Sequence, residues 1–262
     1  MIRRHYVDGR WGQVHVTAAG AGPTLVLLHQ SPLCASQFLP AFPALVAAGL
    51  RVVALDTPGF GASDPPPAPA AMVDHADALL PVLDAIADGP VHLLGHHTGA
   101  AIGAALAARH PGRLASLILN GVPLLDDAER AFFATFRFAP LAPRSDGGHL
   151  VDAWQQRLKA TPGWTDLAAM HAHVATQLAN PDRHHWAFAA VFAHDLAADL
   201  ARITTPTLIL TNSGEDLYAA SGRAAALRPD WAFSALEGGT HDIVDEQPAA
   251  WAAIVAGFVR AH

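Results

Sequence analysis

The amino-acid sequence predicts an α/β fold in which a mostly parallel, twisted β-sheet carries helices on both faces. Two observations support this prediction. Short apolar runs typical of buried strands alternate with helix-like segments over most of the chain, as in parallel sheets joined by helical crossovers. Between about Val122 and Leu200 the alternation stops, which predicts a helical insertion. At 262 residues and 52% hydrophobic content, the chain can bury one sizeable core, and nothing indicates a second independent domain.

The first part of the chain contains three expected strands. Val14 to His29 has the pattern of two strands joined by a turn at Gly20-Ala21-Gly22-Pro23, and the second strand is continuously apolar, as expected when both faces are buried. A helical stretch follows to Ala48. Arg51 to Leu55 is the next expected strand, and it ends in the Pro- and Gly-rich loop from Asp56 to Ser63.

The same alternation continues further along the chain. Val73 to Ala87 and Ala100 to Arg109 have helical spacing. Pro90 to Leu94, Leu114 to Leu119 and Thr207 to Thr211 are typical of buried strands. These elements predict that the sheet resumes after the insertion.

The insertion, residues 122–200, is expected to form a helical cap (lid), with residues 1–121 and 201–262 as the core domain. It is rich in bulky aromatic residues: Phe132, Phe133, Phe136, Phe138, Trp154, Trp164, Trp186, Phe188 and Phe192. Most of these are expected to fill the interior of the cap, and two or three to face a ligand cavity, because pockets are mainly apolar and aromatic. The cap histidines His171, His173, His184 and His185 are expected at its surface or rim.

The segment Gly95-His96-His97-Thr98-Gly99 has the frame of a nucleophile elbow without its nucleophile. In the G-x-S-x-G elbow a strand turns sharply into a helix, and the middle side chain stands exposed at the tip of the turn. That middle residue is His97. A serine, cysteine or aspartate there would attack a carbonyl carbon, whereas an imidazole more naturally moves protons.

Several segments together resemble the α/β-hydrolase family, specifically its capped branch of epoxide hydrolases, haloalkane dehalogenases, esterases and carbon–carbon bond hydrolases. His29-Gln30-Ser31-Pro32 resembles the oxyanion loop H-G-x-P, and Asp56 to Ser63 resembles the turn D-x-P-G-x-G-x-S. Gly238-Gly239-Thr240-His241 resembles the segment that bears the catalytic histidine. The resemblance runs nearly the whole length of the chain, is weakest in the cap, and implies a cofactor-independent hydrolase with an oxyanion hole.

The resemblance also implies roles for individual residues. His241 matches the catalytic base, and the backbone N–H of Thr98, next after the elbow residue, matches one oxyanion donor. Ser31 matches the other donor, through its N–H and its hydroxyl. Gln30 and His29, in the same loop, are expected to contribute to substrate binding.

Two residues compete for the role of the catalytic acid. Counting from the end of the strand Thr207 to Thr211 places Glu215 at the usual position, and one extra residue in the following loop would place Asp216 there. We favour Asp216 and keep Glu215 as the alternative, because Gly214 makes a shift of one residue easy. Asn120 occupies the place where some dehalogenases carry their acid, but an amide cannot ionise.

The sequence departs from the family pattern at two positions. Gln30 replaces the glycine of the oxyanion loop, and His97 replaces the nucleophile. The second departure argues against an acyl-enzyme mechanism. If His97 and His241 face one pocket, the pair can supply one acid and one base, provided that the rings lie within roughly 6 Å of each other.

Other interpretations of these residues stay open. Thr98 is an alternative nucleophile, and Cys34 lies at an expected helix start, where packing is its more ordinary role. His29, His97 and His241 are conceivable ligands of one metal ion, but no recognised ligand spacing accompanies them. We therefore expect no metal and no cofactor.

Composition restricts the partners and the compartment. The net charge is −7 with a single lysine and no basic run, which argues against nucleic acid and acidic membrane surfaces and favours a small uncharged or weakly charged substrate. No signal core or spanning apolar stretch is apparent, so a cytoplasmic location is expected. Cys34 is the only cysteine, which excludes an intramolecular disulfide. A homodimer is one candidate assembly.

The functional hypothesis is an enzyme that acts on a small apolar carbonyl, ester, lactone or epoxide substrate through histidine-assisted water or proton-transfer chemistry, without a serine nucleophile. A lyase, decarboxylase, cyclase or cofactor-free oxygenase on the same fold is the first alternative. A catalytically inactive ligand-binding module is the second.

Overall fold

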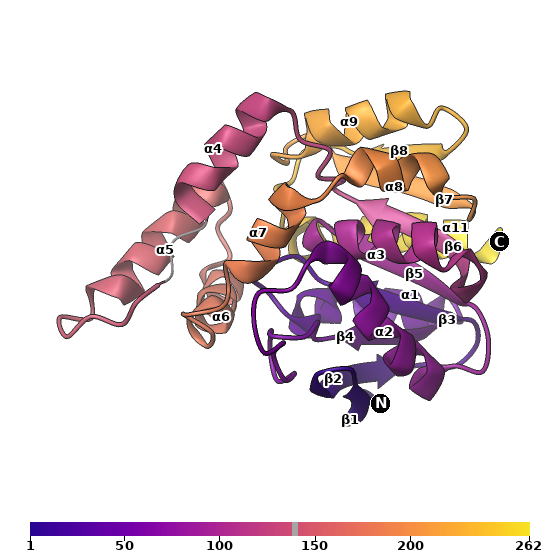
Figure 1. Cartoon of the computed structure of the whole chain (residues 1–262), viewed down its shortest axis with the longest axis horizontal. Coiled ribbons are helices and arrows are strands. Elements are labelled where there is room, and N and C mark those ends of the chain that lie inside the picture. The colour runs from indigo at the N-terminus through magenta and orange to yellow at the C-terminus, as the bar shows by residue number, and fades with distance from the viewer. Residues whose placement is uncertain (138–140) are drawn as a thin grey trace.

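The protein is built on one eight-stranded sheet, as a computed structural model shows for residues 1–137 and 141–262 (Figure 1). The strands lie in the order β1-β2-β4-β3-β5-β6-β7-β8. β1 and β2 pair antiparallel at one edge, β2 also runs antiparallel to β4, and all the other pairs are parallel. The strands are β1 Arg3–Gly9, β2 Gly12–Ala19, β3 Thr24–Leu28, β4 Arg51–Leu55, β5 Val91–His96, β6 Leu114–Asn120, β7 Thr207–Asn212 and β8 Ala232–Leu236.

Helices cover both faces of the sheet, which confirms the predicted fold class (Figure 1). On one face lie α2 (Met72–Ile86), α3 (Thr98–Arg109), α8 (Leu196–Arg202) and α9 (Tyr218–Leu227). The other face carries η1 (Ala35–Ala41), α1 (Phe42–Ala47), α10 (Ile243–Glu246) and α11 (Pro248–Arg260). The turn η2 (Pro111–Arg113) leads from α3 into β6.

The central strands are apolar because both of their faces pack against helices. Alternate residues of β3 enter the two hydrophobic clusters: Val26 and Leu28 face α2 and α3, whereas Leu25 and Leu27 face α1 and α11. The same division separates Leu93 from Leu94 on β5. The carboxyl ends of β3, β5, β6 and β7 meet at one edge of the sheet, which is where ligands bind in open α/β folds.

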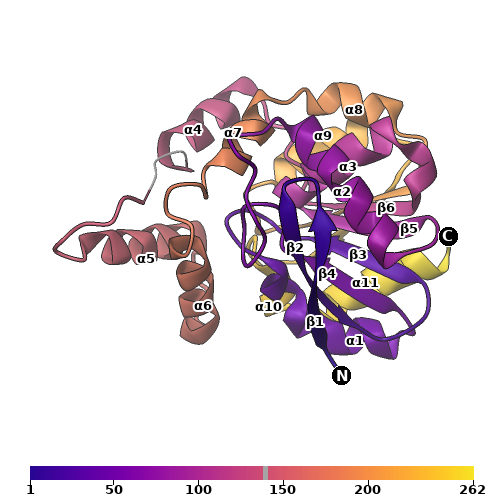
Figure 2. The same ribbon diagram turned by 60° about the horizontal axis from the view of Figure 1, so that its bottom comes forward.

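The helical segment between β6 and β7 comprises α4 (Asp127–Arg137), α5 (Gly148–Ala160), α6 (Leu167–Leu178), α7 (Trp186–Ala193) and α8. In Figures 1 and 2, α4, α5 and α6 project beyond the sheet, whereas α8 packs against α3. The boundary expected at residue 200 falls within α8, so the division into core and cap stays a prediction. Among the described residues, no helix is both long and apolar enough to cross a membrane.

We predict that Gly99→Ala destabilises the fold, because an ideal Cβ at Gly99 would lie 2.2 Å from the carbonyl oxygen of Leu28. That oxygen belongs to a central strand and cannot move aside, so the clash is expected to lower the free energy of unfolding by about 1–3 kcal/mol. Urea unfolding measures the change. The control is Gly257→Ala on α11, where a Cβ meets no atom within 4 Å and a gain of about 0.5–1 kcal/mol is expected. Equal stability of the two variants would contradict the close approach.

We also predict that the fold loses stability in acid because of His75 on α2. Neither nitrogen of this buried ring has a hydrogen-bond partner within the described part of the chain, and the ring packs edge-on against Trp11 with centroids 5.6 Å apart. Burial lowers the pKa of His75 from 6.5 to about 4, against an opposing contribution from Asp74. Between these values the unfolded chain binds more protons, so stability falls as the pH drops from 6.5 to 4, by about 3 kcal/mol in total.

The variant His75→Phe removes this titration. Its unfolding free energy relative to wild type is expected to shift in its favour by about 2–3 kcal/mol between pH 7 and about pH 4.5, as measured by urea unfolding. His5→Phe, at an exposed histidine on β1, is the matched control. If His75→Phe and wild type lose stability in parallel, burial does not depress the pKa of His75.

Candidate active site

His97 stands at a sharp turn between β5 and α3, and the glycines on either side make this turn possible. Its backbone has φ 50 and ψ −104, and it is the single non-glycine residue with positive φ in the described ranges. A Cβ at Gly95 would lie 2.0 Å from the carbonyl oxygen of Gly99, so only glycine fits. The N–H of His97 donates to the carbonyl of Asn120 at 2.8 Å, which ties the tip to β6.

The carboxylate of Glu215 binds the His97 ring. Oε2 of Glu215 lies 2.6 Å from Nε2 of His97, and the other carboxylate oxygen accepts a hydrogen bond from the Thr211 hydroxyl. The Glu215 side chain is fully buried. Gly121 makes room for the pair, because a Cβ there would lie 2.2 Å from Cδ2 of His97 and 2.8 Å from Oε2 of Glu215. Glu215, the alternative candidate for the catalytic acid, therefore contacts the elbow residue directly.

His241 lies close to this pair, with its ring centroid 6.2 Å from that of His97. Its Nδ1 lies 4.0 Å from Asp216 Oδ1, and its Nε2 lies 3.7 Å from Asp242 Oδ2. Both are longer than a hydrogen bond. Asp216, the residue favoured as the acid, therefore lies beside His241, at a greater distance than Glu215 lies from His97.

The oxyanion loop contacts the segment that carries His241. The Gln30 side-chain amide donates to the carbonyl of His241 at 3.0 Å and to Oδ1 of Asp242 at 3.1 Å. The departure from the family glycine thus links two loops that are far apart in the sequence. Ser31 presents a buried hydroxyl with no hydrogen-bond partner in the described structure, and Thr98 occupies the first position of α3, where backbone N–H groups have no intrahelical acceptor.

His29 plays a structural part in the loop. Its Nδ1–H donates to the carbonyl of Gln30 at 2.8 Å, so Nε2 is the acceptor for the Thr57 N–H at 3.0 Å. Burial lowers the pKa of His29. Because both nitrogens of the neutral ring are engaged, His29 offers no lone pair to a metal ion or substrate.

His96 is adjacent to the His97–Glu215 pair, and nitrogens or carboxylate oxygens of the three residues lie within 4.8 Å of one another. Such a group can hold a metal ion only if every ligand atom offers a lone pair. Gln37 accepts the Gln30 N–H with its amide oxygen, so its amide nitrogen donates to Nδ1 of His96. The proton of His96 is then on Nε2, and the ring is not oriented as a ligand. Burial also lowers the pKa of His96 well below its ordinary value, which keeps the ring neutral.

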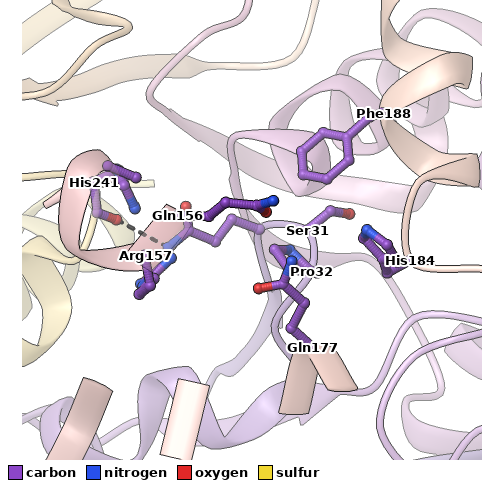
Figure 3. Close-up of a pocket in the computed structure, with 10 residues that line it drawn as sticks. Ser31, Pro32, Gln156, Arg157, Gln177, His184, Phe188 and His241 are labelled. Atoms are coloured by element: carbon purple, nitrogen blue, oxygen red, sulfur yellow. Dashed lines mark hydrogen bonds between the residues drawn. The ribbon is translucent and has the colours of Figure 1, made fainter. Parts of the chain in front are cut away.

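Two small cavities meet at Phe188. One, of about 40 Å³, lies over His97 and Thr98 and has an apolar wall that includes Leu125, Phe192 and Leu217. The other, of about 70 Å³, lies beside His241 and has a wall that combines polar side chains with Pro32, Ala160 and Phe188 (Figure 3). Phe188 lines both cavities. Two aromatic residues of the inserted segment, Phe188 and Phe192, therefore line these cavities, whereas the side chains of Phe133, Phe136 and Phe138 lie outside the described residues.

A buried ion cluster, which the sequence analysis missed, joins helices α5 and α6 to the loop after His241. Asp242 is fully buried and pairs with Nη2 of Arg157 from α5, and His173 from α6 lies 3.6 Å from the same carboxylate. His173 also approaches Asp245 at 3.3 Å. The expectation that His173 lies at the surface is wrong, because this cluster buries it. The adjacency of Asp242 to His241 was the one available signal, whereas Arg157 is 85 positions away in the chain.

The surroundings of Cys34 and Asn120 make a catalytic role for either side chain unfavourable. Burial and the nearby Asp56 raise the pKa of the Cys34 thiol, which works against a reactive thiolate. The side-chain oxygen of Asn120 accepts a 2.6 Å hydrogen bond from the fully buried indole of Trp251. Asn120 is therefore part of the packing beneath the elbow.

Comparisons with a protein family, with curated proteins and with solved structures all find similarity to hydrolases. The α/β-hydrolase fold family matches residues 23–217. A putative carbamate hydrolase, RutD of Variovorax paradoxus, is 33% identical over 184 residues, which cover 65% of each chain. A 2-hydroxy-6-oxononadienedioate/2-hydroxy-6-oxononatrienedioate hydrolase of Dechloromonas aromatica is 40% identical over 114 residues, which cover 42% of this chain and 39% of that relative.

These alignments thus span about two thirds and two fifths of the two relatives. Among solved structures, a hydrolase from Pseudomonas aeruginosa superposes with a TM-score of 0.83 at 25% identity and covers 98% of both chains. The similarity therefore extends over the sheet and the inserted helices together.

Proposed function

The chain belongs to the α/β-hydrolase fold family, and on that premise we propose that it is a hydrolase whose general base is His97 paired with Glu215. Its substrate is a small molecule with an electrophilic carbonyl, ester, lactone or epoxide group. The 2.6 Å contact between His97 Nε2 and Glu215 Oε2 carries this proposal. A buried carboxylate that binds an imidazole orients the ring and stabilises the imidazolium ion that forms when the ring takes a proton.

In the proposed reaction, His97 removes a proton from a water molecule, and the hydroxide attacks the substrate carbon. The ring nitrogen that is not bound to Glu215, Nδ1, receives this proton. The negative charge that develops on a carbonyl oxygen is stabilised by the N–H of Thr98 and by Ser31. Collapse of the tetrahedral species expels the leaving group, which takes up a proton from an imidazolium ion. The elements of water are thus added across the cleaved bond.

His241 is the second acid–base residue of the proposal. Its ring centroid lies 6.2 Å from that of His97, a separation that a substrate atom or one water molecule can bridge. The two histidines can then divide the proton transfers between attack and departure. Asp216 Oδ1 lies 4.0 Å from Nδ1 of His241, and Asp242 Oδ2 lies 3.7 Å from Nε2.

Two alternative functions are separated from the main proposal by their products. An imidazole bound to a carboxylate can also deprotonate a carbon acid, so a lyase or decarboxylase would release CO₂ or cleave a C–C bond without incorporating water. A ligand-binding module would bind tightly and release no product. A panel of an aryl ester, a lactone and an epoxide, assayed in ¹⁸O-water, distinguishes hydrolysis from both alternatives.

We predict that His97→Ala lowers kcat/KM by roughly 10²-fold or more on the substrate that the panel identifies. Glu215→Gln is expected to lower kcat/KM by about tenfold or more, because the amide cannot stabilise the imidazolium charge. The double variant should lose little more than His97→Ala alone, since the two residues act as one unit. The matched controls are His262→Ala and Glu237→Gln, both at exposed positions. Additive losses would contradict the coupling, and near-normal turnover by His97→Ala would show that the elbow histidine is a bystander.

A second prediction concerns covalent chemistry. Because His97 delivers a proton acceptor to water, intact-mass spectrometry during turnover is expected to show no persistent adduct, and serine-directed organophosphorus reagents should leave the enzyme active. The variant His97→Ser is expected to gain modest esterase activity and sensitivity to these reagents, provided that His241 can serve as its base. A persistent acyl or alkyl mass on the wild-type peptide that contains His97 would make histidine the nucleophile. The same mass on Thr98 or Cys34 would identify a different one.

A further inference from the structure

The cavity beside His241 has a wall unlike that of the cavity over His97. Its lining includes Gln156 and Arg157 from α5, Gln177 from α6 and His184 from the turn between α6 and α7, together with Ser31 from the oxyanion loop (Figure 3). In Figure 3, Gln177 reaches in from below, Gln156 points toward the centre, and His184 stands opposite His241. A polar wall of this kind, next to a catalytic region, is suited to a polar part of a ligand.

A buried ion pair holds the Arg157 side chain in place, and its Nε–H donor has no acceptor among the described residues. The residue is 8% exposed, its Nη2 binds Asp242 and His173, and its guanidinium lies 6.0 Å from the Trp164 ring. Its Nε is buried and has no hydrogen-bond partner among the described residues. The buried Ser31 hydroxyl is likewise unpartnered. Both residues line the cavity. Unmade hydrogen bonds at buried donors cost free energy, so an oxygen acceptor that these donors reach after a small side-chain shift would be stabilised.

The neighbouring side chains supply both donors and acceptors. Gln156 and Gln177 each offer an amide oxygen and an amide NH₂ group. His184 donates from Nδ1 to the carbonyl of Pro181 at 3.1 Å, and burial lowers its pKa, so the neutral ring keeps a lone pair on Nε2. A ligand group that both accepts and donates hydrogen bonds can pair with more of these side chains than a group that only accepts.

Charge distinguishes the ligand groups that meet this requirement. The positive charge of Arg157 is already matched by Asp242, and Asp245 adds a second negative charge beside His173. A carboxylate in this cavity would be an additional buried anion next to Asp242, at a high cost in desolvation and repulsion. An uncharged amide carries the same planar oxygen acceptor, adds N–H donors and avoids that cost.

We infer that this cavity binds an uncharged amide end of the ligand, a carboxamide or carbamoyl group, while the apolar remainder extends past Phe188 to the cavity over His97. The amide is a recognition group distant from the bond that reacts. The inference rests on the proposed function only in naming this ligand a substrate, because the binding itself requires no turnover. It also narrows the substrates to bipartite molecules with one apolar and one amide end.

The test compares hexanamide with hexanoate, which share a pentyl tail and differ in the charge of the end group. Binding to the wild-type protein is titrated by NMR chemical shifts at pH 7. Hexanamide is expected to bind at least about tenfold more tightly than hexanoate. Equal affinity, or tighter binding of hexanoate, would overturn the inference.

Variants then test which side chains bind the amide group. Arg157→Lys keeps a positive charge for Asp242 but removes the Nε–H donor, and it is expected to weaken hexanamide binding by about 3- to 10-fold. Gln177→Leu, which leaves the ion cluster intact, is expected to weaken it similarly and serves if Arg157→Lys does not fold. The matched control, Gln155→Leu, changes an exposed glutamine of α5 outside the lining and should bind hexanamide as wild type does. If neither variant weakens binding, the cavity does not hold the amide.

The outcomes separate this inference from the proposed function. Selective hexanamide binding by a protein that hydrolyses nothing in the substrate panel would support the amide site and contradict the hydrolase. Hydrolysis of simple esters without selective hexanamide binding would support the hydrolase and contradict the amide site.

Discussion

Backbone crowding at the turn between β5 and α3 is the constraint on which the site depends. Gly99 allows the turn to pack against β3, Gly95 leaves room for the backbone of Gly99, and His97 between them has a positive-φ conformation. Such a conformation costs about 1–3 kcal/mol in a non-glycine residue and persists only where the surroundings hold it. Here Asn120 binds its N–H, Glu215 binds its ring, and the missing side chain of Gly121 leaves space for both. The strained backbone and the imidazole–carboxylate contact are therefore two aspects of one arrangement.

Asp242 is the second point at which separate parts of the chain converge. Its carboxylate accepts from Arg157 of the inserted helices and from Gln30 of the oxyanion loop, and it follows His241 directly. Removing one partner of a buried ion pair costs about 3–5 kcal/mol, because the remaining charge is left unpaired. Few other contacts join α5 and α6 to the sheet, so this one carboxylate has a large part in setting where those helices lie. The same negative charge decides which ligands the adjacent cavity tolerates.

The fold could be predicted from the sequence because its signals are local. Apolar runs, helical spacing and the glycine frame each span a few residues, and the strands expected at Arg51 to Leu55 and Leu114 to Leu119 are present. The partner of His97 could not be predicted, since Glu215 turns toward the elbow through contacts with Thr211 and Gly121 that exist only in the folded chain. The surface position expected for His173 is wrong for a similar reason: its partners Asp242 and Asp245 come from a distant segment. The acid of the site, the extent of the cap and the oligomeric state stay predictions.

The order of the chain has a consequence for biosynthesis. Glu215 follows His97 by 118 positions, with the whole helical insertion between them. At about 5–20 residues per second, a ribosome releases the elbow roughly 6 to 24 s before the carboxylate that binds it. During that interval β7 and β8 are also missing, so one edge of the central sheet stands open beside a strained turn. The nascent chain therefore passes through a stage in which the elbow segment lacks the contacts that hold it in the folded protein.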